Sequence, residues 1–257
     1  MKKLRFLYRM QLWFDRPVID HYFVLRFVPQ SDSVQKITVD SRSVEPAASL
    51  GEQTDGFGNH MFVGDMREQH SHFSYEVCGT AEVDLNRRMP EQLHPVFRCE
   101  SPLTKADEDL RDFYKKICPS ETCGVQRAVS LMHSLYAHFR YVPGSTNVRT
   151  TAADAWQKGT GVCQDYAHIL ITLCRLDGIP ARYVAGMMLG EGASHAWAEV
   201  YVDGMWTALD PANDCLVTED YIKIAHGRDY SDCAVDRGVF KGNALQTQNV
   251  YVKVEEI

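Results

Sequence analysis

The segment from Cys163 to Pro180 has the apolar spacing of an amphipathic helix, and strand-like segments follow it directly. The apolar positions recur at helical spacing until glycine and proline end the pattern; they are Ala167, Leu170, Ile171 and Cys174. The next segments, RYVAGMML, HAWAEVYVDG and WTALD, have the composition of strands, with a tight Asp-Gly hairpin turn between the last two. A helix followed by an antiparallel sheet predicts an α+β fold for the second half of the chain.

Three residues in this region supply a thiol, an imidazole and a carboxylate: Cys163, His195 and Asp210. A thiolate can attack a carbonyl, a histidine can transfer protons, and a carboxylate can orient the histidine and stabilise the imidazolium. Cys163 opens the helix, where unpaired N–H groups and the helix dipole favour a thiolate and an oxyanion. Gly161 just before it is expected to let the backbone approach a substrate. For Cys163 alone, a buried helical cysteine is the alternative.

The hairpin turn fixes how the two strands pair. With a two-residue turn at Asp203 and Gly204, Val202 faces Met205, and counting outward places Trp197 opposite Asp210. His195 and Asp210 are then diagonal neighbours on one face, close enough for a hydrogen bond.

The same segments resemble the transglutaminase-like superfamily, specifically its small bacterial members, a group often described as cysteine proteases. The resemblance covers Phe139 to Gly242, through YVPGSTNVRTTAADAWQKGTGVCQDYAHILITLCRLDGIPARYVAGMM, SHAWAEVYVDGMWTALDP and HGRDYSDCAVDRGVFKG. DGFGNHMFV in the first ninety residues resembles that group's N-terminal β region. Val235 stands where relatives usually carry proline, and the hairpin between the histidine and the aspartate is unusually short. The resemblance implies an N-terminal antiparallel β-sandwich followed by a papain-like or transglutaminase-like core.

By the resemblance, Cys163 is the nucleophile, His195 the general base and acid, and Asp210 the residue that orients the histidine. The implied activity is cysteine-dependent acyl transfer or amide or peptide hydrolysis on a peptide or protein substrate, through a thioester acyl-enzyme. Water as acceptor gives hydrolysis and an amine gives a new amide, and the three residues do not distinguish them. The alternative is a non-catalytic peptide-binding or scaffolding protein with the same fold.

Four further residues are candidates for substrate binding, each with a structural alternative. Trp156 lies on a short predicted helix before the nucleophile turn, and Tyr141 begins a loop toward the site; both also suit core packing. Gln164 follows the nucleophile directly, and Trp197 lies on the predicted hairpin, where core packing is the default. Asp165 is expected to cap the helix rather than bind substrate.

The first half of the chain reads as strands. Five strand-like segments predict a small antiparallel sandwich or barrel: LRFLYRMQLWF, HYFVLRFVP, VQKITVDSRSV, HMFVGDM and HFSYEVCGTAEVD. A proline-containing linker and two helical segments follow, so we expect an N-terminal region at residues 1–90 and a catalytic core at residues 100–257. A final strand with alternating valines, Val250, Val252 and Val254, could complete either sheet.

Composition limits the partners and the compartment. A net charge of −7 gives no electrostatic footprint for nucleic acid or an anionic membrane, so neither is expected as a partner. The N-terminal segment has no uninterrupted apolar stretch or cleavage site, which predicts a cytoplasmic protein. The eight cysteines are scattered and form no CxxC pair, so we expect reduced thiols and no zinc site. No loop has the acidic spacing of a calcium site, so we expect no calcium dependence. No cofactor is expected, and the oligomeric state stays open.

Overall fold

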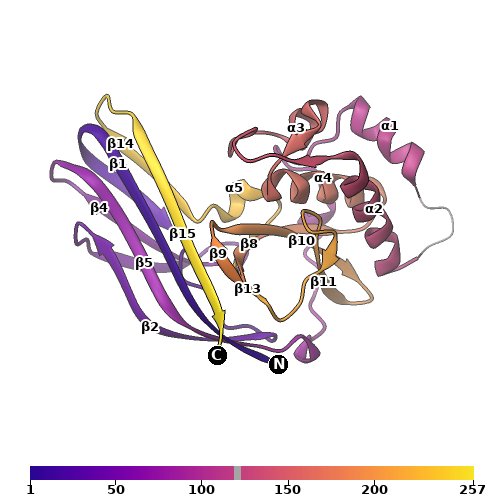
Figure 1. Cartoon of the computed structure of the whole chain (residues 1–257), viewed down its shortest axis with the longest axis horizontal. Coiled ribbons are helices and arrows are strands. Elements are labelled where there is room, and N and C mark those ends of the chain that lie inside the picture. The colour runs from indigo at the N-terminus through magenta and orange to yellow at the C-terminus, as the bar shows by residue number, and fades with distance from the viewer. Residues whose placement is uncertain (119–122) are drawn as a thin grey trace.

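The computed structural model describes residues 1–118 and 123–257 and has two parts (Figure 1). A curved sheet of long strands forms one part, and a smaller sheet packed with helices forms the other. The two chain ends lie side by side, since Leu4 at one end pairs with Glu256 at the other. The fold is mixed α+β with mostly antiparallel pairing, which confirms the predicted fold class.

The first sheet has eight strands among the described residues, in the order β2-β5-β1-β15-β9, with β14 and β4 also on β1 and β3 on β4. These strands are β1 (Lys2–Leu25), β2 (Gln35–Glu45), β3 (Leu50–Thr54), β4 (His60–Met66), β5 (His70–Val83), β9 (Gly190–Gly192), β14 (Asp236–Lys241) and β15 (Gln246–Glu256). Alternate residues of β1 from Leu4 to Phe14 are buried, as expected for a sheet with one covered face.

Strand β1 belongs to both layers of this sheet. Its first half pairs with β5 and β15 and its second half with β4 and β14, with a register shift between Trp13 and Val18. The strand bends there instead of ending, so two predicted strands are one. The two layers face each other, because the ring of Phe23, in the second half of β1, and the ring of Phe73 of β5 have centroids 4.8 Å apart. The layers therefore enclose an apolar core in the manner of a sandwich.

The C-terminal strands complete the first sheet, which settles the open alternative for the final strand. Strand β15 pairs with β1 from Phe14 to Leu4, and β9 pairs with β15. The division of the chain into an N-terminal region at residues 1–90 and a core at residues 100–257 stays a prediction. In space, however, three strands from beyond residue 100 lie in the N-terminal sheet.

The core has a second sheet, in the order β12-β11-β10-β8-β13. Its strands are β8 (Ala181–Met188), β10 (His195–Val202), β11 (Met205–Asp210), β12 (Cys215–Leu216) and β13 (Tyr221–Gly227). The helices are α1 (Glu108–Ile117), α2 (Val125–His138), α3 (Ala152–Lys158), α4 (Cys163–Leu176) and α5 (Tyr230–Cys233), and the short elements are η1 (Leu85–Arg87), η2 (Pro95–Arg98), β6 (Arg140–Tyr141) and β7 (Thr160–Gly161). Helix α4 is buried along its length and packs on β10 and β8, which fixes its N-terminus against the sheet.

Two further properties bear on function. Over residues 1–118 and 123–257, no helix is both long and apolar enough to cross a membrane. The eight cysteines, all of them among the described residues, have free thiols.

Candidate active site

Helix α4 begins at Cys163 and is capped from within its first turn. Asp165, which is fully buried, accepts hydrogen bonds from the Val162 N–H at 2.8 Å and from the Thr146 hydroxyl at 2.6 Å. The predicted capping role of Asp165 is therefore confirmed. A Cβ on Gly161 would lie 2.6 Å from Asp165, so the close approach that needs this glycine is to the cap and not, as expected, to a substrate.

His195 begins β10 and Asp210 ends β11, and the hairpin brings them together. The pairs Val202–Met205 and Ala198–Leu209 have the register that the two-residue turn predicts. His195 Nε2 donates a hydrogen bond to Asp210 Oδ2 at 2.6 Å. Cys163 and His195 line the wall of the same pocket. Since Nε2 is used by Asp210, Nδ1 is the nitrogen left for the thiol.

Asp210 is fully buried and held from several sides. Besides His195, its Oδ2 accepts from the Tyr221 hydroxyl at 2.9 Å and from Asn213 Nδ2 at 2.8 Å, and its Oδ1 accepts from the Ala212 N–H at 3.0 Å. Burial alone would raise the pKa of Asp210, but the hydrogen bond and charge of His195, with Asn213 and Tyr221, lower it. The carboxylate is therefore ionised and fixed in orientation.

His195 is held in its protonated form. Burial lowers its pKa, but the hydrogen bond to Asp210 and the charges of Asp210 and Cys163 together outweigh burial and raise the pKa to about 10. A protonated imidazole next to a thiol stabilises the negative charge of the thiolate, so this arrangement favours ionisation of Cys163.

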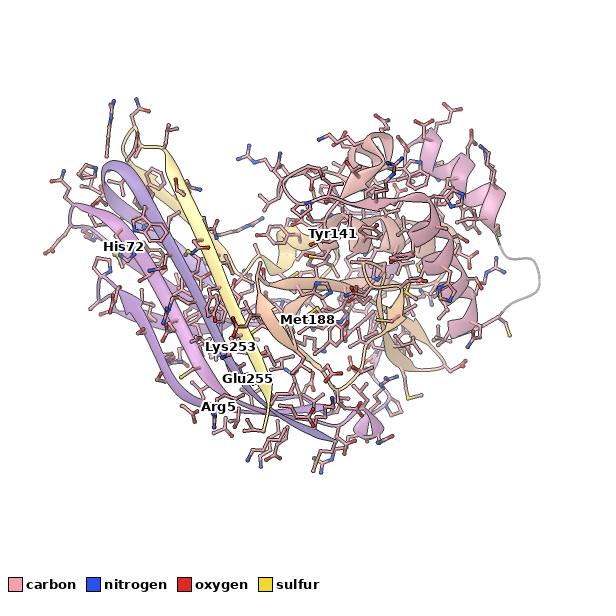
Figure 2. All side chains as sticks on the ribbon, in the orientation of Figure 1. Arg5, His72, Tyr141, Met188, Lys253 and Glu255 are labelled. Atoms are coloured by element: carbon pink, nitrogen blue, oxygen red, sulfur yellow. The ribbon has the colours of Figure 1, made fainter. Side chains whose placement is uncertain are left out.

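The thiol opens into a pocket of about 230 Å³. Cys163 and His195 lie in its wall with Tyr141, and residues 188–194 form its rim. Val252 of β15 also lines it, because β9 pairs with β15 next to the site. Figure 2 shows Met188 of this wall close to the strand that carries Lys253. The first sheet therefore contributes directly to the pocket.

Comparison with known proteins agrees with this architecture. The family model "Transglutaminase-like superfamily" matches residues 111–211, and the model "Bacterial transglutaminase-like N-terminal region" matches residues 4–82. The chain carries a transglutaminase-like core behind a bacterial transglutaminase-like N-terminal region.

Individual relatives agree with the family models. A solved structure from Cytophaga hutchinsonii, described as a "Putative Cysteine Protease", is 25% identical, with a TM-score of 0.84 over 100% of this chain and 91% of that one. An uncharacterized protein from Mycobacterium leprae is 26% identical over 100% of both chains. An uncharacterized protein from Mycobacterium tuberculosis is 36% identical over 44% of this chain and 41% of its own length. The chain therefore shares its fold over its whole length with the Cytophaga hutchinsonii structure.

The structure brings only some of the predicted substrate-binding residues to the pocket of the transglutaminase-like core. Tyr141 lines it and is 51% exposed. Gln164 is half-buried beside the thiol on α4, and its role stays a prediction. Trp156 is not among the pocket residues: its ring packs on Phe113, with centroids 4.1 Å apart.

Trp197 is not among the residues that line the pocket, and its predicted role in substrate binding stays a prediction. Its side chain is buried, and its ring lies stacked 6.4 Å from that of His195 and edge-on to Tyr221. Gly186 on the neighbouring strand makes room for it, because a Cβ there would lie 2.4 Å from the indole. Trp197 therefore fixes the position of His195 and excludes water beneath it.

Two residues of the site were missed by sequence reasoning. Asn213 follows Asp210 by three residues, in DPAND, so an Asx-type turn after the strand was a usable signal. Tyr221 comes from β13, whose distance along the chain gave no indication of the contact. As for metals, the described part of the chain has no group of three or more His, Cys, Asp or Glu side chains placed to hold an ion.

Proposed function

We propose that this protein is an enzyme that cleaves or transfers the acyl group of an amide or peptide bond, with Cys163, His195 and Asp210 as its catalytic residues. The single observation that carries the proposal is the position of His195, which is hydrogen-bonded to buried Asp210 at 2.6 Å and lies with Cys163 in the wall of one pocket. A histidine between a carboxylate and a thiol at a helix N-terminus is the arrangement that generates a thiolate nucleophile.

The reaction follows from these positions. Cys163 Sγ attacks the carbonyl carbon and forms a C–S bond, while the carbonyl π electrons move to oxygen. The N–H groups of the first turn of α4, which lack helical acceptors, can stabilise that oxyanion. Collapse of the intermediate breaks the C–N bond, and His195 gives its proton to the departing amine. The product is a thioester between the acyl group and Cys163.

The second half-reaction depends on the acceptor. His195, now neutral, takes a proton from water or an amine, which attacks the thioester and releases Cys163. Residues 189–193 at the pocket rim are exposed, so water has access to an acyl-enzyme. This exposure supports hydrolysis of a peptide or protein over transfer to an amine, since transfer requires exclusion of water.

A first experiment tests activation of the thiol. Iodoacetamide labelling from pH 5 to 9, read by peptide mass spectrometry, compares Cys163 with the exposed cysteines Cys99 and Cys123 in the same sample. We expect Cys163 to react faster near neutral pH than the two other cysteines, which serve as the internal reference. His195→Ala should slow Cys163 alone. Equal pH profiles for all three cysteines would contradict an activated pair.

A second experiment separates the enzyme from the alternative, a peptide-binding protein with the same fold. Turnover is measured on a peptide library with the native chain, Cys163→Ala and the control Cys99→Ala. We expect cleavage by the native chain and the control, and none by Cys163→Ala. Activated labelling at Cys163 without turnover of any peptide would favour the binding protein.

A further inference from the structure

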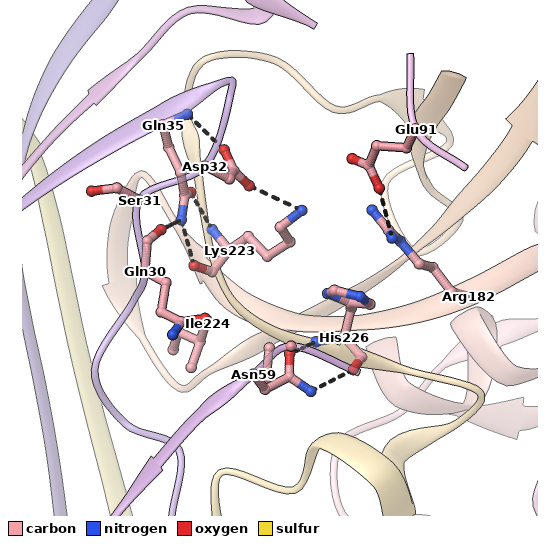
Figure 3. A pocket seen from close by; sticks show the side chains of 12 residues that line it. Gln30, Ser31, Asp32, Gln35, Asn59, Glu91, Arg182, Lys223, Ile224 and His226 are labelled. Atoms are coloured by element: carbon pink, nitrogen blue, oxygen red, sulfur yellow. Dashed lines mark hydrogen bonds and ion pairs between the residues drawn. The ribbon is translucent and has the colours of Figure 1, made fainter. Parts of the chain in front are cut away.

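A second cleft lies away from the thiol, between the core sheet and loops of the N-terminal sheet (Figure 3). Along β10, Ala198 and Val200 belong to the main apolar core, so Glu199 between them points to the other face of the sheet. The cleft has a volume of about 250 Å³. It is lined by Arg182 of β8, by residues 223–226 of β13, by loop residues 30–32 and by Gln35 at the start of β2. No residue of the proposed catalytic set lines it.

Two cations in this cleft share one buried carboxylate. Arg182 Nε donates to Glu199 Oε2 at 2.5 Å, and Lys223 Nζ lies 3.6 Å from Glu199 Oε1. Burial would raise the pKa of Glu199, but the charges of Arg182 and Lys223 outweigh it and hold the pKa at about 2. Arg182, Lys223 and Glu199 together carry one positive charge in excess. Because buried charges are normally matched, a further negative group is expected beside them.

The remaining countercharges come from the rim. Asp32 Oδ2 lies 3.2 Å from Lys223 Nζ, and Glu91 Oε2 lies 3.5 Å from an Arg182 nitrogen. Their side chains are 32% and 48% exposed, against 4% for Arg182. Asp32 and Glu91 therefore approach the two cations from the solvent side. Because exposed ion pairs contribute little free energy, a ligand carboxylate could replace either of these two side chains at a small energetic cost.

His226 adds a neutral hydrogen-bonding group to the same opening. Asn59 fixes its backbone, donating to the carbonyl at 2.7 Å and accepting from the N–H at 2.8 Å. In Figure 3 its ring points toward the side where Arg182 lies. Burial and the charges of Arg182 and Lys223 hold its pKa well below the usual value, so the ring is neutral and can donate one N–H.

An apolar chamber of about 340 Å³ adjoins the charged one and shares Arg182, His226 and Glu91 with it. Trp206 and Phe97 form its wall, with ring centroids 5.3 Å apart, edge to face. The Arg182 guanidinium lies 4.0 Å from the centre of the Trp206 ring. A charged end and a flat apolar wall thus meet at Arg182.

We propose that this cleft is a second ligand site, which binds a small organic monoanion with its carboxylate between Arg182, Lys223 and His226 and its apolar body against Trp206 and Phe97. Once the ligand displaces the rim carboxylates Asp32 and Glu91, the one-unit positive excess of Arg182, Lys223 and Glu199 matches a single negative charge. The aromatic wall selects a ligand with a flat apolar group over a simple inorganic anion.

Titration calorimetry at low salt tests the site with phenylacetate, its neutral isostere phenylacetamide, and acetate, which lacks the ring. We expect phenylacetate to bind the native chain at least about tenfold tighter than either, because a charge-assisted contact and ring burial both contribute. Equal affinity for phenylacetate and phenylacetamide, or no binding of phenylacetate, would overturn the proposal.

Two variants locate the binding. Lys223→Met keeps most of the apolar stem and should weaken phenylacetate binding by about tenfold or more, whereas Lys241→Met, at an exposed lysine of the first sheet, should leave it unchanged. Glu91→Gln should tighten binding severalfold, because it removes a competing carboxylate at the rim. Glu91 is exposed, so this variant gives an answer even if Lys223→Met fails to fold. Unchanged affinity in Glu91→Gln would place the binding elsewhere and overturn the proposal.

Discussion

At the scale of single residues, the charge of Asp210 keeps His195 protonated, and the proposed thiolate depends on it. Asp210→Asn retains the shape and most hydrogen bonds of the side chain but removes the charge. The pKa of His195 should fall from about 10, and Cys163 alkylation at pH 7 should slow by about tenfold or more. Iodoacetamide kinetics on the variant measure this.

A nearby carboxylate provides the matched control for that variant. Asp214 pairs with His133 at 2.6 Å, outside the pocket that contains the thiol. Asp214→Asn should therefore leave Cys163 alkylation unchanged. If both variants slowed the reaction equally, general electrostatics and not the Asp210–His195 pair would control the thiol.

A buried histidine in the first sheet gives a prediction about pH. Burial and the nearby charge of His70 lower the pKa of His21 to about 4. Because the folded pKa lies below the unfolded value of about 6.5, its neutral form stabilises the fold above pH 6.5, and this contribution is lost as pH falls toward 4. The loss amounts to about 3 kcal/mol.

Urea unfolding at pH 7.5 and pH 5 measures this pH dependence. His21→Phe, among aromatic neighbours such as Phe23 and Phe73, should flatten the dependence even if it lowers stability overall. His72→Phe, at a partly exposed position on β5, should keep the native slope. An unchanged slope in His21→Phe would show that other groups cause the pH dependence.

The three proposed catalytic residues were predictable from the sequence, and the supporting residues were not. A cysteine at a helix start and a histidine and aspartate across a two-residue turn are local signals. Tyr221 reaches Asp210 only through the pairing of β13 with β8, which no local pattern encodes. Likewise, the apolar character of Trp156 and Trp197 was visible, but whether each ring faced the pocket or the core depended on tertiary packing.

At the scale of elements, the start of α4 depends on Gly161. A Cβ there would overlap the Asp165 side chain that caps the helix, so Gly161→Ala must displace the cap. We expect a loss of about 1–3 kcal/mol in the free energy of unfolding and slower Cys163 alkylation. Gly56→Ala is the control, because a Cβ there meets no atom within 4 Å. Equal stability of the two variants would contradict this role.

The boundaries of a strand were predictable where a local turn sets them. They were not predictable where pairing with a distant strand sets them. The β10–β11 register followed from the Asp203-Gly204 turn alone. The bend in β1 was read as a break, because Asp15, Arg16 and Pro17 have turn composition. Strand β9, with the sequence Gly-Glu-Gly, has no apolar alternation and exists through its pairing with β15.

At the scale of the whole molecule, the first sheet holds the core by side-chain amides as well as by shared strands. Strand β13 is an edge strand of the core sheet. Buried Gln35 bonds the backbone of Lys223 at 2.8 and 2.9 Å, and buried Asn59 bonds that of His226. These amides satisfy backbone groups that an edge strand leaves unpaired. The N-terminal sheet and the core are therefore expected to unfold together.

Asn59→Ala tests this cooperativity. It leaves a buried N–H and C=O of His226 without partners and should cost about 1–3 kcal/mol, whereas Asn86→Ala, at an exposed site, should cost little. In urea, strand content by circular dichroism and exposure of buried Cys174 in the core should change in one transition, shifted to lower urea in Asn59→Ala. Two separate transitions would instead show that residues 1–90 and 100–257 fold as independent units, despite the three strands that cross between them.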